Sequence, residues 1–156
     1  MSHSNSPIAD LVSSALFDEA TFYKKFVKDL SNCTQEVIIE SPYITTTRMN
    51  LLTPTFEELL RQRVKVFIMT RDPKEHGESL EIQSELAIRQ CEALGIQVLL
   101  CAGNHHRKLA ILDRKVLWEG SLNILSQTKS REIMRRIESE RLAAEMFDFL
   151  NLGRFI

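Results

Sequence analysis

Apolar residues recur along this chain in two patterns that follow one another several times. Phe17, Phe22, Phe26 and Leu30 stand at helical spacing, which is typical of an amphipathic helix. Elsewhere, short apolar runs stop at turn-forming residues and predict buried strands. Together the two patterns predict helices over residues 17–30, 50–63 and 79–94, and strands over residues 36–43, 64–71 and 96–103.

The order of these elements, with strands and helices in alternation, indicates how the strands pair. Strands that are joined by crossover helices run parallel, so residues 36–103 predict a set of parallel strands. Within the middle helical segment, we expect the helix to begin at Pro54 with Thr53 as its N-cap. The last of the three helices is expected to end at Gly95.

The pattern changes after Gly103, where the apolar runs of residues 106–113 and 116–121 are separated only by Arg114 and Lys115. A two-residue connection joins antiparallel strands, so these runs predict a hairpin. A further strand over residues 132–139 and a closing helix over residues 140–153 complete the chain. The sequence therefore predicts an α/β fold with a mixed, largely parallel β-sheet flanked by helices.

Length and composition are those of one globular domain. The chain has 156 residues, of which 44% are hydrophobic and 26% are charged, which is enough to form a core. The Ser-rich start predicts a flexible N-terminal tail over residues 1–14 and a single domain over residues 15–156. No apolar run approaches the roughly 18 residues that span a bilayer, and the start does not resemble a secretion signal. We therefore expect a cytoplasmic protein that does not bind membranes.

Cysteine and histidine give no indication of a metal or a disulfide. Cys33, Cys91 and Cys101 are odd in number and widely spaced, which predicts buried, reduced thiols. The four histidines are not accompanied by a second set of ligands at a suitable spacing. We therefore expect no metal and no cofactor.

Charge is distributed unevenly, although the net charge of the chain is only −1. Residues 104–136 contain eight Lys or Arg and three acidic residues, a local charge of +5, so the remainder carries −6. A basic segment favours binding to an anion. A solvated strand face with scattered charge would give the same count, so the charge alone leaves both interpretations open.

The same segment places two candidate catalytic side chains on one strand. His106 and Lys108 share a face of the predicted strand, with backbones roughly 6–7 Å apart, a spacing that suits two groups holding one tetrahedral anion. With a two-residue loop, the hairpin register places Ser121 opposite Lys108 and Asn123 opposite His106. His105 points to the other side of the strand and is expected to be a surface or structural residue.

The motif H-x-K-x4-D, followed after six residues by G-S-x-N, resembles the signature of the phospholipase D superfamily. Its six fixed positions lie within 18 residues: His106, Lys108, Asp113, Gly120, Ser121 and Asn123. The apolar segments of residues 37–52 and 64–71 also resemble this family, so the similarity covers about residues 15–140. With one copy of the motif, the chain is similar to the small single-motif bacterial endonucleases of the superfamily.

This resemblance implies a phospholipase D-like fold and a metal-independent phosphodiesterase. In the family, one histidine attacks phosphorus to form a phosphohistidine, and the histidine of a second motif protonates the leaving oxygen. Because one motif is present here, the resemblance implies a homodimer in which His106 is the nucleophile in one subunit and the general acid in the other. Lys108 would neutralise the phosphate, and Ser121 and Asn123 would donate hydrogen bonds to it.

Two carboxylates belong to the same assignment. Asp113 is either a turn former or a supporting catalytic residue. Glu132 is the nearest candidate for the carboxylate that orients the histidine in this family.

Three classes of function fit a phosphodiester site of this kind. A nuclease would bind the nucleic-acid backbone with basic residues near the motif and would be largely blind to base sequence. A lipid phosphodiesterase would need an exposed apolar docking element, which does not stand out here, and a silent nucleic-acid-binding module of a larger complex would carry a damaged motif. We therefore predict a non-specific nuclease that prefers DNA to RNA. Its candidate substrate-binding residues are Arg107, Arg114, Lys115, Lys129, Arg131, Arg135 and Arg136.

Overall fold

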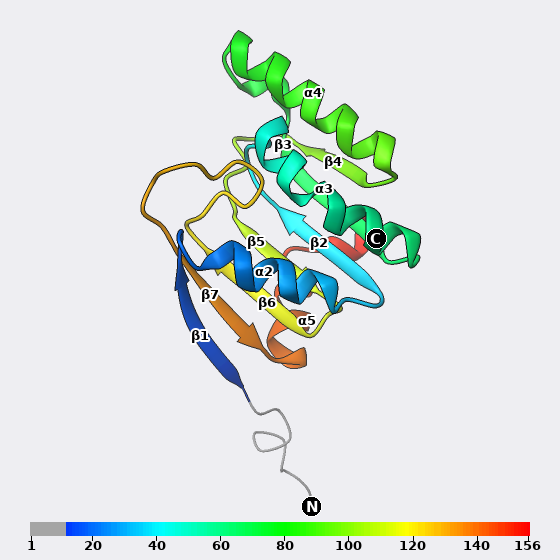
Figure 1. Ribbon diagram of the computed structural model, residues 1–156, viewed down its shortest axis with the longest axis vertical. Coiled ribbons are helices and arrows are strands. Elements are labelled where there is room, and N and C mark those ends of the chain that lie inside the picture. The colour runs from blue at the N-terminus through cyan, green and yellow to red at the C-terminus, as the bar shows by residue number, and fades with distance from the viewer. Residues whose placement is uncertain (1–11) are drawn as a thin grey trace, which may run out of the picture.

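A seven-stranded mixed sheet, with strand order β1-β7-β6-β5-β2-β3-β4, organises the computed structural model, which describes residues 12–156 (Figure 1). The strands are β1 (Ser13–Asp18), β2 (Glu36–Glu40), β3 (Lys65–Arg71), β4 (Gln97–Cys101), β5 (Leu109–Leu112), β6 (Val116–Gly120) and β7 (Ile133–Glu138). The helices are α2 (Phe22–Ser31), α3 (Thr46–Arg61), α4 (Glu78–Leu94) and α5 (Glu140–Phe149), with short 3-10 turns η1 (Pro73–Glu75) and η2 (Leu152–Arg154).

The predicted mixed α/β sheet is confirmed. Strands β2, β3 and β4 are parallel, as the alternation of strands and helices predicted. The other four pairs, β2 with β5, β5 with β6, β6 with β7 and β7 with β1, are antiparallel. The antiparallel share is larger than we expected: β1, which was not predicted, adds one antiparallel pair, and the pairing of β5 with β2 and of β7 with β6 adds two more to the predicted hairpin.

Helices cover both faces of the sheet (Figure 1). One core cluster joins α2, α3 and α4 to residues such as Val37 and Ile39 of β2. A second, smaller cluster lies on the opposite face, where α5 covers Ile38 and Ile111. Because β2 has helices on both sides, all of its central residues are buried, which explains the continuous apolar run in the sequence.

The start of α3 differs from the prediction. The helix begins at Thr46, Thr45 is its N-cap, and Pro54 lies inside the helix. The buried residues Met49, Leu52, Phe56 and Leu59 form one stripe that continues across the proline. Packing of this stripe therefore outweighs the backbone hydrogen bond that proline cannot donate.

The N-terminal end also differs from the prediction. Phe17 lies in β1, and the first helix begins only at Phe22. Residues 1–11 of the predicted tail lie outside the described residues, but Ser13 and Ser14, also assigned to the tail, pair with β7. The boundary predicted at residue 15 therefore falls inside β1.

The hairpin of β5 and β6 is confirmed, but its predicted register is wrong by one residue. Leu112 pairs with Val116, which makes the turn three residues long. Asp113 leaves the strand with a φ of 53°, and its carboxylate accepts hydrogen bonds from the backbone N–H groups of Thr34, Gln35 and Glu36 at 2.8–2.9 Å. These bonds stabilise the left-handed backbone that the longer turn requires.

Candidate active site

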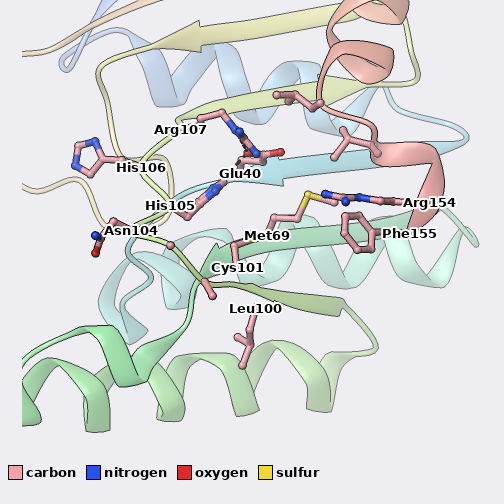
Figure 2. Close-up of a pocket in the computed structure, with 14 residues that line it drawn as sticks. Glu40, Met69, Leu100, Cys101, Asn104, His105, His106, Arg107, Arg154 and Phe155 are labelled. Atoms are coloured by element: carbon pink, nitrogen blue, oxygen red, sulfur yellow. Dashed lines mark hydrogen bonds and ion pairs between the residues drawn. The ribbon is translucent and has the colours of Figure 1, made fainter.

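The motif histidine lies in the connection between β4 and β5, before the strand in which the sequence analysis placed it. Strand β5 begins only at Leu109, so His106 and Lys108 belong to an irregular segment. They nevertheless meet, because Lys108 Nζ lies 2.6 Å from His106 Nδ1 and donates a hydrogen bond to the His106 carbonyl oxygen at 3.0 Å. Figure 2 shows His106 pointing outward from this connection.

The surroundings favour a neutral His106. Desolvation, followed by the positive charges of Lys108 and Arg71, lowers the pKa of this imidazole below its ordinary value. Desolvation also lowers the pKa of Lys108, while the charge of Glu132 opposes this shift. The site therefore presents an imidazole with an unprotonated nitrogen, held beside an ammonium group.

The end of β6 brings a hydroxyl and a carboxylate to the same place. A Cβ atom at Gly120 would lie 2.2 Å from the Ile133 carbonyl oxygen, so only glycine permits this close approach of β6 and β7. The next residue, Ser121, then donates its N–H to the Ile133 carbonyl at 2.9 Å and accepts the Ile133 N–H on its Oγ at 3.0 Å. These bonds fix Ser121 at the edge of the site.

Glu132 is an ionised carboxylate beside Lys108. Hydrogen bonds from Ser121 and Ser130 lower the pKa of Glu132, and the charge of Lys108 lowers it further. The opposite charges of Glu132 and Lys108 thus stabilise one another, and Ser121 links Glu132 to the end of β6. The role of Glu132 as the carboxylate that orients His106 stays a prediction.

The two remaining motif residues behave differently. Asn123 follows Ser121 at the start of the β6–β7 loop, where its carbonyl oxygen accepts the N–H groups of Ser126 and Gln127. Its side-chain Oδ1 is buried and has no hydrogen-bond partner within the described residues. Asp113 lies at the opposite end of β5 from Lys108 and caps the chain before β2, which supports the turn-forming alternative.

Of the basic residues that we expected to bind substrate, three lie next to site residues along the chain. Arg107 follows His106 and lines a pocket beside the motif, and Lys129 and Arg131 are exposed on the β6–β7 loop that carries Ser121 and Glu132. Contact of these residues with a bound substrate stays a prediction.

The other four do not belong to that group. Arg114 and Lys115 lie in the hairpin turn at the far end of β5, where Arg114 pairs with Glu36. Arg135 bonds to Ser14 of β1. Arg136 pairs with the buried Asp29, so it is a structural residue. The spacing of charges along the sequence did not show that Arg114 and Lys115 lie in the hairpin turn or that Arg136 pairs with Asp29.

The sequence analysis missed three residues near the site: Glu40, Tyr43 and Arg71. Glu40 ends β2 and Arg71 ends β3, and parallel strands bring their carboxyl ends to one edge of the sheet. Arg71 Nε donates to the His105 carbonyl oxygen at 3.0 Å, and Arg71 Nη1 donates to the Tyr43 hydroxyl at 3.3 Å. The Tyr43 ring in turn lies edge-on to His106, with 6.4 Å between ring centroids.

His105 is buried, in keeping with the structural role that we expected for it. Its Nε2 atom lies 3.2 Å from Glu40 Oε1. Burial lowers the pKa of His105 to about 4, so this imidazole is neutral at neutral pH. Figure 2 shows a pocket that His105, Glu40, His106 and Arg107 line, with the His106 ring turned away from Glu40.

A second pocket, of about 520 Å³, opens beside the motif. It is lined by His106, Lys108 and Ser121 and, from α5, by Met146 and Phe149. Phe149 is 83% exposed. Within residues 12–156, no three His, Cys, Asp or Glu side chains are grouped as a metal site would require, and no helix has the length and apolar character to cross a membrane.

Comparison with known proteins gives one family. A family model described as "Cardiolipin synthase, PLD-like domain" matches residues 26–151. No curated protein matches the chain in sequence.

Solved structures share the fold. Nuc from Salmonella typhimurium, a phospholipase D family member, has a TM-score of 0.71 at 16% identity over 89% of this chain and 91% of that one. NucT from Helicobacter pylori has a TM-score of 0.64 at 16% identity over 89% and 93%. Phosphatidylserine synthase from Haemophilus influenzae has a TM-score of 0.67 at 17% identity over 93% of this chain and 39% of that one. At these identities the likeness shows the fold alone.

Proposed function

The chain belongs to the phospholipase D-like family, and from this premise we propose that it is a metal-independent nuclease that acts through a phosphohistidine. The observation that carries the proposal is the group of His106, Lys108, Ser121 and Glu132. A neutral imidazole serves as nucleophile, and an ammonium group 2.6 Å away serves as a phosphate ligand.

The contact between Lys108 and His106 in the free protein indicates how substrate binding activates the nucleophile. An ammonium group has no lone pair and can only donate, so Lys108 occupies a lone pair of the imidazole. An entering phosphate attracts Lys108 more strongly than a neutral ring does, because its oxygens carry negative charge. Transfer of this hydrogen bond to the phosphate frees the lone pair of His106 when the substrate is in place.

The reaction then proceeds in two displacements. In the first, a nitrogen of His106 forms a bond to phosphorus, the bond from phosphorus to the leaving oxygen breaks, and that oxygen takes a proton from a second, protonated histidine. In the second, water attacks phosphorus, the phosphorus–nitrogen bond breaks, and the water proton returns to the second histidine. Lys108 and Ser121 hold the phosphate oxygens throughout.

The second histidine is proposed to be the His106 of another copy of the chain. Of the other histidines in residues 12–156, His105 is buried and His76 stacks on Tyr43 with ring centroids 5.1 Å apart. A symmetric homodimer with the two motifs at its axis supplies the missing group.

Nucleic acid, with DNA before RNA, is the proposed substrate. Arg71, Arg107, Lys129 and Arg131 add positive charge around His106 and Lys108, and backbone binding requires such charge. One observation supports a lipid as the second candidate, because the exposed Phe149 lies beside the same pocket. An apolar chain could contact this ring.

The test compares these substrates under identical conditions. Wild-type protein is incubated in excess chelator with labelled DNA, labelled RNA and phospholipid vesicles, and His106→Ala serves as the matched control. We expect cleavage of DNA that persists in chelator and is absent in the variant. Cleavage of the phospholipid alone would move the assignment to the second candidate, and activity that returns only with added magnesium would contradict the mechanism.

A further inference from the structure

We propose that Glu40 is a positioning residue that holds the His106 segment in its catalytic geometry, an inference that rests on the proposed function. Glu40 is the last residue of β2 and is fully buried. It contacts the two neighbours of His106 in the sequence, one on each side. It does not contact His106 itself, so its effect acts through the backbone between them.

Both contacts are made to one oxygen atom. Arg107 Nε donates a hydrogen bond to Glu40 Oε1 at 2.9 Å, and His105 Nε2 lies 3.2 Å from the same atom. Because residues 105 and 107 turn toward β2, the residue between them turns outward, as Figure 2 shows for His106. Strand pairing with β6 reaches back only to the Lys108 carbonyl, which accepts the Gly120 N–H at 3.4 Å, so it does not set the orientation of residues 105–107.

Arg71 adds a second restraint on the same segment. Its guanidinium donates to the His105 carbonyl oxygen at 3.0 Å. The carbonyl of His105 is thus held by the end of β3, while its side chain packs against the end of β2 without a hydrogen bond from Nε2. Two rigid strands of the sheet therefore determine where His106 stands.

The other oxygen of Glu40 indicates that this arrangement does not serve stability. Glu40 Oε2 is buried and has no hydrogen-bond partner within the described residues. A buried carboxylate with one unpaired oxygen costs folding free energy, and burial accordingly raises the pKa of Glu40. A costly buried group with a functional neighbour is expected where a site must be held in place.

Strand β2 also provides a matched control at its other end. Glu36, its first residue, pairs with Arg114, whose Nε lies 2.5 Å from Glu36 Oε2. This pair has the same chemistry but lies at the hairpin turn, at the far end of β5 from Lys108. A change there alters a Glu–Arg pair on the same strand without touching the His106 segment.

The experiment compares Glu40→Met, Glu40→Gln and the control Glu36→Met. For Glu40→Met we expect a melting temperature equal to or above that of the wild type, because Arg107 is half-exposed and can hydrate when it loses its partner. We expect kcat to fall about 10- to 100-fold with KM almost unchanged, as for a displaced catalytic group. Glu40→Gln retains an acceptor for Arg107 and should lose less, and Glu36→Met should retain full kcat.

A second readout does not depend on turnover. The pKa of His106, followed by NMR titration of the ring protons, should rise toward the ordinary histidine value in Glu40→Met, because the ring leaves the positive charges of Lys108 and Arg71. Glu36→Met should show no such rise. If the wild type has no activity but the titration shifts as expected, the positioning role stands and the proposed function fails. Unchanged kcat and an unchanged titration in Glu40→Met, or a kcat that falls only together with the melting temperature, would overturn the inference.

Discussion

Replacement of Arg136 by alanine should destabilise the protein and leave the DNA affinity of the folded protein unchanged. The guanidinium makes two hydrogen bonds to the buried Asp29, from Nε to Oδ2 at 2.7 Å and from Nη2 to Oδ1 at 2.9 Å. Asp29 Oδ2 also accepts the indole N–H of Trp118 at 2.9 Å. Arg136→Ala therefore leaves a buried carboxylate with one neutral donor and with the Lys25 ammonium group, whose Nζ lies 3.8 Å from Asp29 Oδ1.

The size of the effect follows from these contacts. Hydrogen bonds to charged groups contribute about 1.5–3 kcal/mol each, and removal of one partner of a buried ion pair costs about 3–5 kcal/mol. For a chain of this length, each kcal/mol lowers the melting temperature by about 2–4 °C. We therefore expect a decrease of about 6–20 °C in thermal unfolding, and a matching loss in urea unfolding.

Arg135→Ala is the matched control. Arg135 is the preceding residue on β7, is exposed, and bonds only to Ser14 among the contacts described here. Its loss should cost less than about 1 kcal/mol. Equal melting temperatures for the two variants would refute the reasoning, as would weaker DNA binding by Arg136→Ala at a temperature where it remains folded.

Three further predictions concern the turn, the strand contact and the nucleophile. Asp113→Ala leaves three backbone N–H groups without their acceptor and should cost about 1–3 kcal/mol of stability, while kcat of the folded protein stays at the wild-type value. Gly120→Ala forces β6 and β7 apart, because its Cβ would lie 2.2 Å from a carbonyl oxygen, so both the melting temperature and kcat should fall. Because a neutral His106 is the nucleophile and a protonated His106 of the second copy is the acid, kcat/KM should rise with pH, pass through a maximum and fall again. The pKa of His106 is lowered, so the rising limb should lie below the ordinary histidine pKa of about 6.5. A rising limb that lies only above that value would contradict the assignment.

The elements that the sequence predicted best are those in which one period of apolar residues dominates. Strands β2, β3 and β4 and helix α4 were found within a few residues, and Gly95 ends α4 with a φ of 104° as expected. The errors arose where a local signal competed with packing. Pro54 was interpreted as a helix start, but a buried stripe extends the helix eight residues upstream of it. Edge strand β1 is almost entirely exposed and therefore has no apolar alternation to detect.

The catalytic motif was found from its spacing, although the geometry assumed for it was wrong. His106 and Lys108 were expected to share a strand face, and a two-residue turn was expected to bring Ser121 opposite Lys108. The structure brings His106, Lys108 and Ser121 together through other contacts. Lys108 contacts His106 from an irregular segment, and the close approach of β6 to Ile133 places Ser121. A motif constrains which side chains must meet, but turn conformations such as the left-handed Asp113 decide the register.

The supporting residues could have been predicted by one further physical step. Once β2 and β3 are predicted to be parallel, their carboxyl ends must lie at one edge of the sheet, next to the connection that follows β4. Each strand ends in a charged residue, Glu40 and Arg71, after a continuous apolar run. A charged residue at the end of a buried strand requires a partner. The connection between β4 and β5, which carries the polar and cationic residues around His106, is the segment that this topology brings to the same edge. The pairing of Glu40 with Arg107, and not with Arg71, still depends on side-chain packing that the sequence pattern does not contain.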